Sequence, residues 1–227
     1  SMLPLEDISA MFLTHFHADH WADMAEVIDR SWLLGRRHVF PIYGGQGIEQ
    51  IVNDTTSAYS LEYSYRTAHH GEQVMPPESV EVIPTTINVF GTDAVIVYEK
   101  DGVLVTAFNV KHSPIEPALG FKISFAGKEI VISGDTIETE TLAAQSQSVD
   151  VLVSEVMNME SIALAEKVFS ENGYEDNAII FHDIQDYHIS TTQLATLAEA
   201  AEVKHLILTH LAPNIDNAKI METLFRK

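Results

Sequence analysis

The sequence predicts a mixed α/β protein, and three observations support that class. Apolar runs of strand length recur along the 227 residues, with turns between some of them and helical stretches between others. Nearly half of the residues are hydrophobic, which is enough for a substantial core. We find no internal repeat and no linker, so residues 1–227 are interpreted as one domain. Strands and helices in this mixture pack as layers, and we expect a sandwich with helices outside the strands.

Two hairpins are predicted from their turn residues. Asp101-Gly102 separates the apolar runs Ala94–Tyr98 and Val103–Phe108, which is a strong hairpin pattern. Ala126-Gly127 separates the next two apolar runs and is a weaker example. Both predict antiparallel neighbours in a sheet.

Three stretches show helical periodicity. Gly173 supplies a stop after the second stretch, and Ser190 with Gln193 makes a capping-box pattern ahead of the third. The apolar residues that define the three faces are Trp21, Met24, Ala25, Ile28 and Trp32; Ile162, Ala165 and Phe169; and Leu194, Leu197, Ala198 and Ala201.

The chain is strongly acidic, with a formal net charge of −20. Such a field repels nucleic-acid phosphate and anionic lipid, and no basic stripe interrupts it. No apolar stretch is long and uncharged enough to span a bilayer. From the sequence alone we therefore expect neither a nucleic-acid partner nor a membrane partner.

The chain contains no cysteine, which excludes disulfides and thiolate metal ligands. Any metal must then be held by imidazole and carboxylate. The absence of cysteine leaves the compartment open, cytoplasmic or periplasmic.

The most specific local motif is Thr14-His15-Phe16-His17-Ala18-Asp19-His20, between an apolar run and an amphipathic helix. His15 and His17 are two residues apart, so an extended backbone projects them to the same side. Asp19 and His20 are expected to begin the helix. Four ligand-type side chains within six residues suit two adjacent metal ions better than one. The alternative is a histidine-rich surface loop.

Three more ligand-type residues follow apolar, strand-like runs: His112, Asp135 and His210. Strand ends at one edge of a sheet are where loops converge into a site. A lone histidine such as His112 or His210 is more often a structural, hydrogen-bonded residue. In combination with the first motif, the three favour a metal site.

The motif series resembles that of the metallo-β-lactamase superfamily. His-x-His-x-Asp-His, a single His, Ser-Gly-Asp-Thr and Leu-Thr-His occur in the family's order, from about Leu5 to the end of the chain. Other segments are similar to the ribonuclease Z and arylsulfatase-like branch. They are Val110–Pro114, Ala118–Phe121, Val131–Thr136, Tyr187–Ser190 and Leu206–Leu211.

That resemblance implies an αββα sandwich with two divalent metal ions, zinc first and manganese or iron as alternatives. It also implies that Asp135 bridges the ions and that His188 protonates the leaving group or steadies the transition state. Asp19 and His188 are thus the catalytic candidates. The implied ligands are His15, His17 and His112 for one ion, and Asp19, His20 and His210 for the other.

The sequence departs from the family pattern in two places. Family members usually begin with two or three strands and a glycine-rich turn ahead of the first motif, so we expect this domain to be N-terminally incomplete. Only a short hairpin lies between His112 and Asp135, where transfer-RNA processing enzymes commonly carry a long basic arm. We therefore rank transfer-RNA 3′ processing low.

The expected function is hydrolysis of a small anionic ester, a sulfate or a phosphate, by a metal-bridging hydroxide. Lactone or thioester hydrolysis on the same metals is the second enzyme hypothesis, and a non-catalytic metal-binding protein of this fold is the third. A redox di-iron protein ranks lower, because that branch typically has glutamate where His17 stands. A homodimer is left open.

A few polar residues remain outside the site on sequence grounds. His69 and His70 are expected in a solvated turn. His182 also stays outside the site, although it is less easily dismissed because it lies near His188 in sequence. Glu155 is a candidate for a group that orients a ligand or His188. The alternative for His188 is a hydrogen bond at the entry of the following helix.

Overall fold

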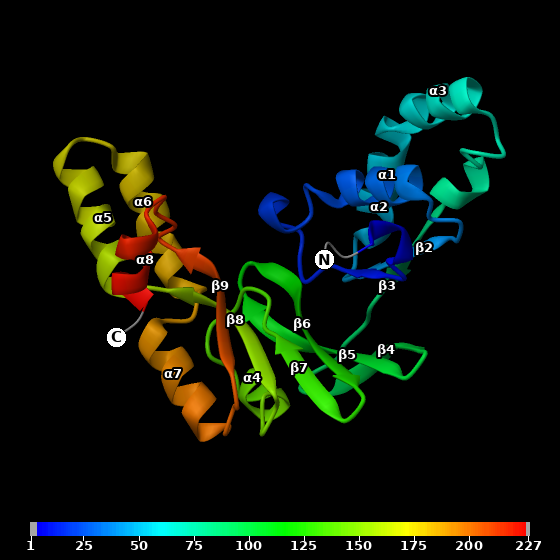
Figure 1. Cartoon of the computed structure of the whole chain (residues 1–227). Helices are drawn as coiled ribbons and strands as arrows, with labels where there is room; N and C mark the ends of the chain where they lie inside the picture. The colour runs from blue at the N-terminus through cyan, green and yellow to red at the C-terminus, as the bar shows by residue number, and fades with distance from the viewer. Residues whose placement is uncertain (1–3, 226–227) are drawn as a thin grey trace. The chain divides into compact units, whose positions relative to one another are not determined.

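A computed structural model describes residues 4–225, and its contacts divide the chain into two compact units, Ser1–Asn88 and Val89–Lys227 (Figure 1). Both units combine a β-sheet with helices, which confirms the predicted α/β class. The assignment of residues 1–227 to a single domain stays a prediction. Within the described residues, every helix is too short or too polar to cross a membrane.

The first unit is built on a three-stranded parallel sheet of order β1-β2-β3. Helix α1 connects β1 to β2, and α2 and α3 connect β2 to β3, as parallel strands require a crossover. The bounds are β1 Met11–Phe12, α1 Met24–Leu34, β2 Phe40–Gly44, α2 Ile48–Ala58, α3 Ser60–His70 and β3 Val82–Thr86, with 3-10 turns at Leu5–Asp7, Ala18–His20 and Pro77–Val80.

The core of this unit lies between the sheet and the first two helices. Alternate residues of β2, Phe40 and Ile42, are fully buried against Ile28 of α1 and Val52 of α2. Burial of four such side chains stabilises the unit by about 1.5–3 kcal/mol each, before conformational entropy is counted. Apolar packing therefore anchors this sheet, whose strand β1 directly precedes the first histidine motif.

Two sequence predictions in this unit need correction. The helix expected from Trp21 begins at Met24, and the Trp21 indole donates from Nε1 to the Phe16 carbonyl at 3.1 Å in the preceding turn. His69 and His70 occupy the last turn of α3 and not a solvated loop. In both places the sequence pattern misplaced a helix end: Trp21 lies before α1, and His69 and His70 lie inside α3.

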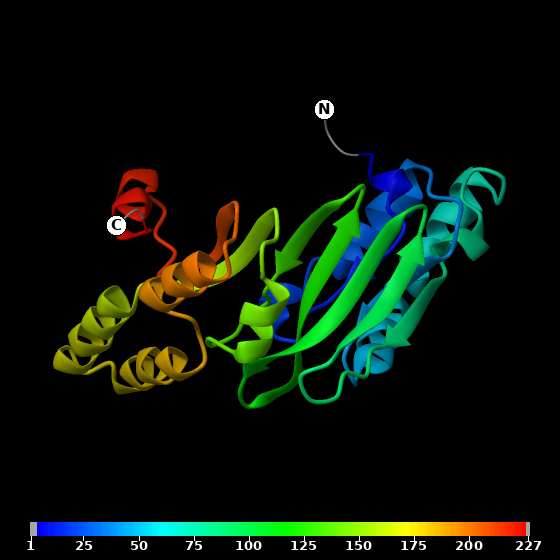
Figure 2. The ribbon, with the colours of Figure 1, turned by 90° about the horizontal axis from the view of Figure 1, so that it is seen from below.

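The second unit is built on a six-stranded sheet of order β4-β5-β6-β7-β8-β9 (Figure 2). Strands β4 to β7 are antiparallel neighbours, which confirms both predicted hairpins, and β8 and β9 are added in parallel. The bounds are β4 Ala94–Lys100, β5 Val103–His112, β6 Ile115–Phe125, β7 Lys128–Ile132, α4 Glu140–Gln145, β8 Val151–Met157, α5 Met159–Glu171, α6 Glu175–Asp183, a 3-10 turn at Ile184–Asp186, α7 Thr191–Ala200, β9 Leu206–Ala212 and α8 Ala218–Phe225.

Strand direction decides which side chains can meet in this unit. Strands β5 and β7 are both antiparallel to β6, so they run the same way, and β8 and β9 run parallel to β7. Four strands therefore bring their carboxyl ends to one edge of the sheet. This arrangement explains how residues distant in sequence can form one site.

Helices α4 and α7 cover one face of this sheet through an apolar cluster. Leu142 of α4 and Leu194 of α7 pack with Phe108 and Leu152 of the sheet. The predicted capping box of α7 is present, with Ser190 accepting from the Gln193 backbone N–H at 3.1 Å. Helices α5 and α6 form a separate pair beside each other at the end of β8.

Candidate metal centre

The shared edge of the second sheet carries three of the predicted ligands. His112 ends β5, Asp135 follows β7, and His210 lies in β9. The Asp135 Oδ2 atom is 4.0 Å from His112 Nε2 and 3.6 Å from His210 Nε2. Asp135 is only 3% exposed, and a buried carboxylate is stabilised by a positively charged partner such as a bound cation.

Both histidines sit at irregularities of the strand ladder. Thr209 pairs with Glu155 and Leu211 with Val156, which leaves His210 as an extra, bulged residue with φ +44°. A second register shift separates Val110 from His112. A bulge redirects a side chain at the cost of local strain, and such strain is concentrated at functional sites.

The orientation of His112 is set by a backbone carbonyl. Its Nδ1–H donates to the Tyr187 carbonyl oxygen at 3.0 Å, which leaves Nε2 with its lone pair on the side of Asp135. The Tyr187 ring packs edge-on against the imidazole at 5.0 Å. A hydrogen bond on the far ring nitrogen is the usual way in which a protein selects the tautomer of a metal-binding histidine.

His188 is held by a buried carboxylate. Its Nδ1–H donates to Glu155 Oε1 at 2.9 Å, and the same oxygen accepts the Thr136 backbone N–H at 2.8 Å. Glu155 is fully buried, His188 is 8% exposed, and a bridge between Met157 and Ser190 ties this loop to the end of β8. The predicted pairing of Glu155 with His188 is therefore present. The helix-entry hydrogen bonds are made by Ser190 and Gln193 instead.

Burial raises the pKa of Glu155, and the hydrogen bond from His188 opposes that shift. The second carboxylate oxygen, Oε2, is buried and has no hydrogen-bond partner among the described residues. The hydrogen bond to Oε1 orients the His188 ring through its Nδ1 atom.

The side chains of this edge are chemically suited to a divalent cation. One ligand atom each from His112, Asp135 and His188 lie within 4.8 Å of one another, and the same holds for Glu155, His188 and His210. Imidazole and carboxylate are the ligands that zinc takes where thiolate is lacking. His188 belongs to both groups, so its geometry also permits a ligand role.

The first motif forms its own cluster within the first unit. The His15 and His17 rings approach at 3.2 Å between Nε2 and Nδ1, and the His15 and His20 ring centroids are 4.1 Å apart. His20 Nε2 lies 3.4 Å from Asp19 Oδ2, and the Asp19 side chain is 65% exposed. Asp19 and His20 occupy the 3-10 turn Ala18–His20, one turn before α1, and do not begin that helix.

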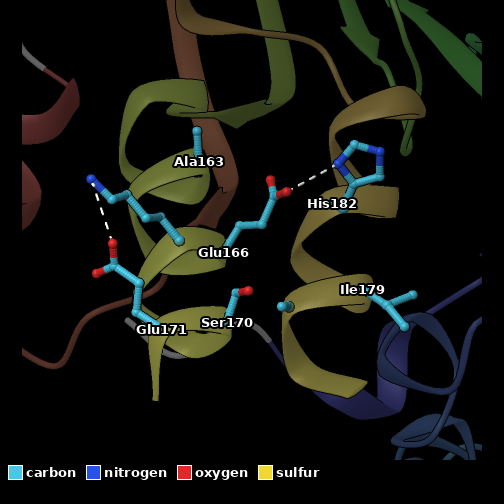
Figure 3. A pocket seen from close by; sticks show the side chains of 8 residues that line it. Ala163, Glu166, Ser170, Glu171, Ile179 and His182 are labelled. Atoms are coloured by element: carbon cyan, nitrogen blue, oxygen red, sulfur yellow. Dashed lines mark hydrogen bonds and ion pairs between the residues drawn. The ribbon is translucent and has the colours of Figure 1, made fainter. Parts of the chain in front are cut away.

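Figure 3 shows His182 in a contact between two helices. It lies on α6 and faces Glu166 of α5, with 3.2 Å between His182 Nδ1 and Glu166 Oε1, beside a cavity of about 480 Å³. His182 is 68% exposed at its side chain. It belongs to the contact between the two helices, and sequence proximity to His188 was misleading.

Imidazole and carboxylate groups gathered at the strand ends of an α/β fold are typical of metal-dependent hydrolases. The chain belongs to the metallo-β-lactamase superfamily, in its ribonuclease Z branch, since the family described as "Beta-lactamase superfamily domain" matches residues 2–211. This confirms the predicted resemblance. Family membership implies a divalent metal, typically zinc.

Curated relatives and solved structures agree with that assignment. Ribonuclease Z of Mycobacterium bovis (strain BCG / Pasteur 1173P2) is 30% identical over 211 residues, which cover 92% of this chain and 69% of the relative. Ribonuclease Z of Mycolicibacterium gilvum is 33% identical, with 92% and 67% covered.

Among solved structures, human tRNase Z, short form, matches with a TM-score of 0.63 at 18% identity, covering 93% of this chain and 75% of that one. The metallo-beta-lactamase fold protein YhfI from Bacillus subtilis matches with a TM-score of 0.61 at 17% identity, covering 99% and 73%. Both likenesses confirm the fold.

These relatives overturn one expectation from composition. The net charge of −20 argued against a nucleic-acid partner, yet the relatives that match most of the chain are named ribonucleases. Net charge describes the long-range field, which salt screens beyond about 8–10 Å, and it does not describe the site itself. The prediction that no nucleic acid is involved was wrong.

Proposed function

We propose that this protein is a metal-dependent phosphodiesterase whose substrates include nucleic-acid phosphodiesters. The observation that carries the proposal is the pairing of buried Glu155 with His188 at the sheet edge that also holds Asp135. A metal site alone would suit a binding protein. An oriented imidazole beside the predicted ligands is what acid catalysis of ester cleavage requires.

The proposed metal ligands come from both histidine clusters, with two zinc ions as the expected load and manganese or iron as alternatives. Bound divalent cations supply Lewis acidity, which activates water near neutral pH and attracts an anionic ester. Asp135 would serve more than one ion, a role supported by the approach of both of its histidine neighbours to the same carboxylate oxygen. The full ligand set is His15, His17, Asp19, His20, His112, Asp135 and His210.

His188 is proposed as the group that protonates the leaving alcohol. Hydrolysis adds water to phosphorus and breaks the bond from phosphorus to the leaving oxygen, which takes a proton. With Nδ1–H bound to Glu155, the second proton of an imidazolium resides on Nε2 and can be donated there. Asp19, exposed beside His20, is the second catalytic candidate and would accept a proton from water.

The test is a substrate panel on protein loaded with zinc or manganese. It compares bis-p-nitrophenyl phosphate, an aryl sulfate, a lactone, a thioester and an RNA that carries a 3′ extension. We expect phosphodiester turnover, with cleavage of the RNA at a defined position. His188→Ala should reduce that turnover, whereas His182→Ala, the same change at an exposed histidine of α6, should not.

The outcome that contradicts the proposal is equally specific. Turnover of the lactone or the aryl sulfate with no cleavage of either phosphodiester would assign a different ester class to the site. Binding of metal with no turnover of any substrate would indicate the non-catalytic alternative.

A further inference from the structure

Helices α5 and α6 occupy the stretch of chain between the two partners of the Glu155–His188 hydrogen bond. Glu155 lies in β8, which leads into α5, and His188 follows the 3-10 turn Ile184–Asp186 at the end of α6. The two helices pack against each other through the rings of Phe169 and Phe181, whose centroids are 5.1 Å apart. The segment that carries His188 therefore starts from this helix pair.

One carboxylate of α5 holds both the end of α6 and the turn that follows it. Glu166 Oε2 accepts a hydrogen bond from Gln185 Nε2 at 2.9 Å. Glu166 Oε1 lies 3.2 Å from His182 Nδ1 (Figure 3). Gln185 Nε2 also donates to the Phe181 carbonyl oxygen at 2.8 Å. Since a hydrogen bond to a charged acceptor is about twice as strong as a neutral one, Glu166 is a firm anchor for this turn.

The turn held by Gln185 continues directly into the metal centre. Two residues further on, the Tyr187 backbone carbonyl oxygen accepts the hydrogen bond from His112 Nδ1 at 3.0 Å. The next residue, His188, donates to Glu155 at 2.9 Å. A shift of this turn would therefore move one proposed metal ligand and the proposed proton donor together.

The far end of the same segment is fixed to the sheet. The Met157 backbone N–H at the end of β8 donates to the Ile189 carbonyl oxygen at 2.9 Å. Tyr187 and His188 lie between this contact and Gln185, so the short segment is held at both ends. A displacement of about 1 Å, even from a change far from the chemistry, can reduce a rate about 10²-fold. The sheet supplies one anchor of the segment, and α5 supplies the other.

We propose that Glu166 is a positioning residue of this site, which acts through Gln185 to fix the segment that carries Tyr187 and His188. The inference rests on the proposed phosphodiesterase function, because it gives α5 and α6 a role in that reaction. The contact with His182 is separate from this path, since His182 approaches the other oxygen of the carboxylate. Loss of the Gln185 contact should impair turnover, and loss of the His182 contact should not.

The first experiment measures kcat and KM of zinc-loaded variants with a dinucleoside monophosphate, whose leaving alcohol needs a proton. Glu166→Ala should lower kcat about 10-fold, the lower end of the loss seen when a group that orients a functional histidine is removed. KM should change little. Glu166→Gln, whose amide oxygen can still accept from Gln185, should restore most of the rate. His182→Ala and Glu171→Ala are the controls, the second of which removes an exposed ion pair with Lys167 on the same helix.

The leaving group and a double variant test the path itself. With bis-p-nitrophenyl phosphate the loss in Glu166→Ala should be smaller, because nitrophenolate needs little protonation and a misplaced His188 matters less. Glu166→Ala/Gln185→Ala should be no slower than the slower single variant, since both changes break the same contact. Losses that multiply in the double variant would overturn the inference, as would equal losses in Glu166→Ala and His182→Ala.

A measurement that needs no turnover separates this inference from the proposed function. NMR of the zinc-loaded protein follows the two imidazole Nδ1–H protons that the segment holds in place, on His112 and His188. In Glu166→Ala these protons should exchange faster with water, and in His182→Ala they should keep their wild-type rates. That outcome supports the positioning role even if no phosphodiester is cleaved. Unchanged exchange in Glu166→Ala overturns it, whether or not the protein is an active phosphodiesterase.

Discussion

The two histidine clusters of this protein are assembled in opposite ways. The first occupies one continuous segment, residues 15–20, in which ligands meet because they are neighbours in the chain. The second draws His112, Asp135, His188 and His210 from four places that span about 100 residues. The first therefore needs only a strand end and a turn. The second exists only if the six-stranded sheet forms in the correct register.

The aspartates of the two clusters also differ, in how far each is exposed to solvent. The Asp19 side chain is 65% exposed and can be solvated by water, whereas Asp135 is 3% exposed between two imidazoles. A buried carboxylate is tolerated only with partners that stabilise its charge. The second cluster should therefore respond more strongly to the loss of one member than the first.

The largest effect is expected from Asp135→Ala. It removes the oxygen that both His112 and His210 approach, so turnover should be abolished and the metal content should fall below that of the wild type. Elemental analysis after dialysis and the rate with bis-p-nitrophenyl phosphate measure the two quantities. Asp183→Ala, at the end of α6, is the control. Full metal loading in Asp135→Ala would show that the second cluster does not depend on its carboxylate.

His188→Ala tests the division between ligands and proton donor within the second cluster. Turnover should fall about 10²–10⁴-fold while the metal content is retained, because the imidazole is proposed as an acid and not as a ligand. The loss should be smaller for nitrophenolate leaving groups, which need little protonation. His182→Ala should change neither quantity. Loss of a metal ion from His188→Ala would assign His188 to the ligand set, as its distances permit.

Glu155→Gln should have an intermediate effect, about 10–100-fold, as is usual for groups that orient a functional histidine. The amide can still accept the His188 Nδ1–H but carries no charge. Because burial raises the pKa of Glu155, its carboxyl takes up a proton at a higher pH than an ordinary glutamate as the pH falls. The wild-type rate should therefore decline on the acidic side, and Glu155→Gln should lack that decline. A pH profile with an unchanged acidic limb in the variant would contradict this assignment.

The smallest effect concerns the stability of the sheet on which the second cluster depends. Asp150 accepts from Lys128 Nζ at 2.9 Å, from Lys204 Nζ at 3.1 Å and from the Glu129 backbone N–H at 3.0 Å. These contacts hold the pKa of Asp150 below its usual range, with the hydrogen bond from Lys128 as the main cause. The stabilisation is present above the unfolded pKa of about 3.9 and is lost as pH falls through the lower folded value.

Asp150→Asn should accordingly lower the melting temperature slightly at neutral pH, and the difference from the wild type should shrink in acid. Calorimetry at several pH values measures it, and added salt should also reduce the difference. A melting difference that stays constant from neutral to strongly acidic pH would show that the charge of Asp150 is not what stabilises this edge.

Local features were predictable from the sequence because short-range geometry determines them. The histidine motif at residues 15–20, the Asp101-Gly102 hairpin and the capping box of Ser190 all depend on residues a few positions apart. Helices α2 and α3 were not predicted, since tertiary packing supplies most of the stability of short helices. The expectation about nucleic acid was wrong because the net charge sums over the whole chain and does not describe the charge at one site.

By itself, the sequence determined the α/β class, the family and the residue types from which a metal site can be built. Only the tertiary structure decided that Glu155 orients His188, 33 positions further along the chain, and that a bulge turns His210 toward Asp135. It also brought Glu166 of α5 to Gln185, a contact for which no motif gave a sign. The physical reason is that strand direction and register choose which distant residues become neighbours, and no local propensity encodes that choice.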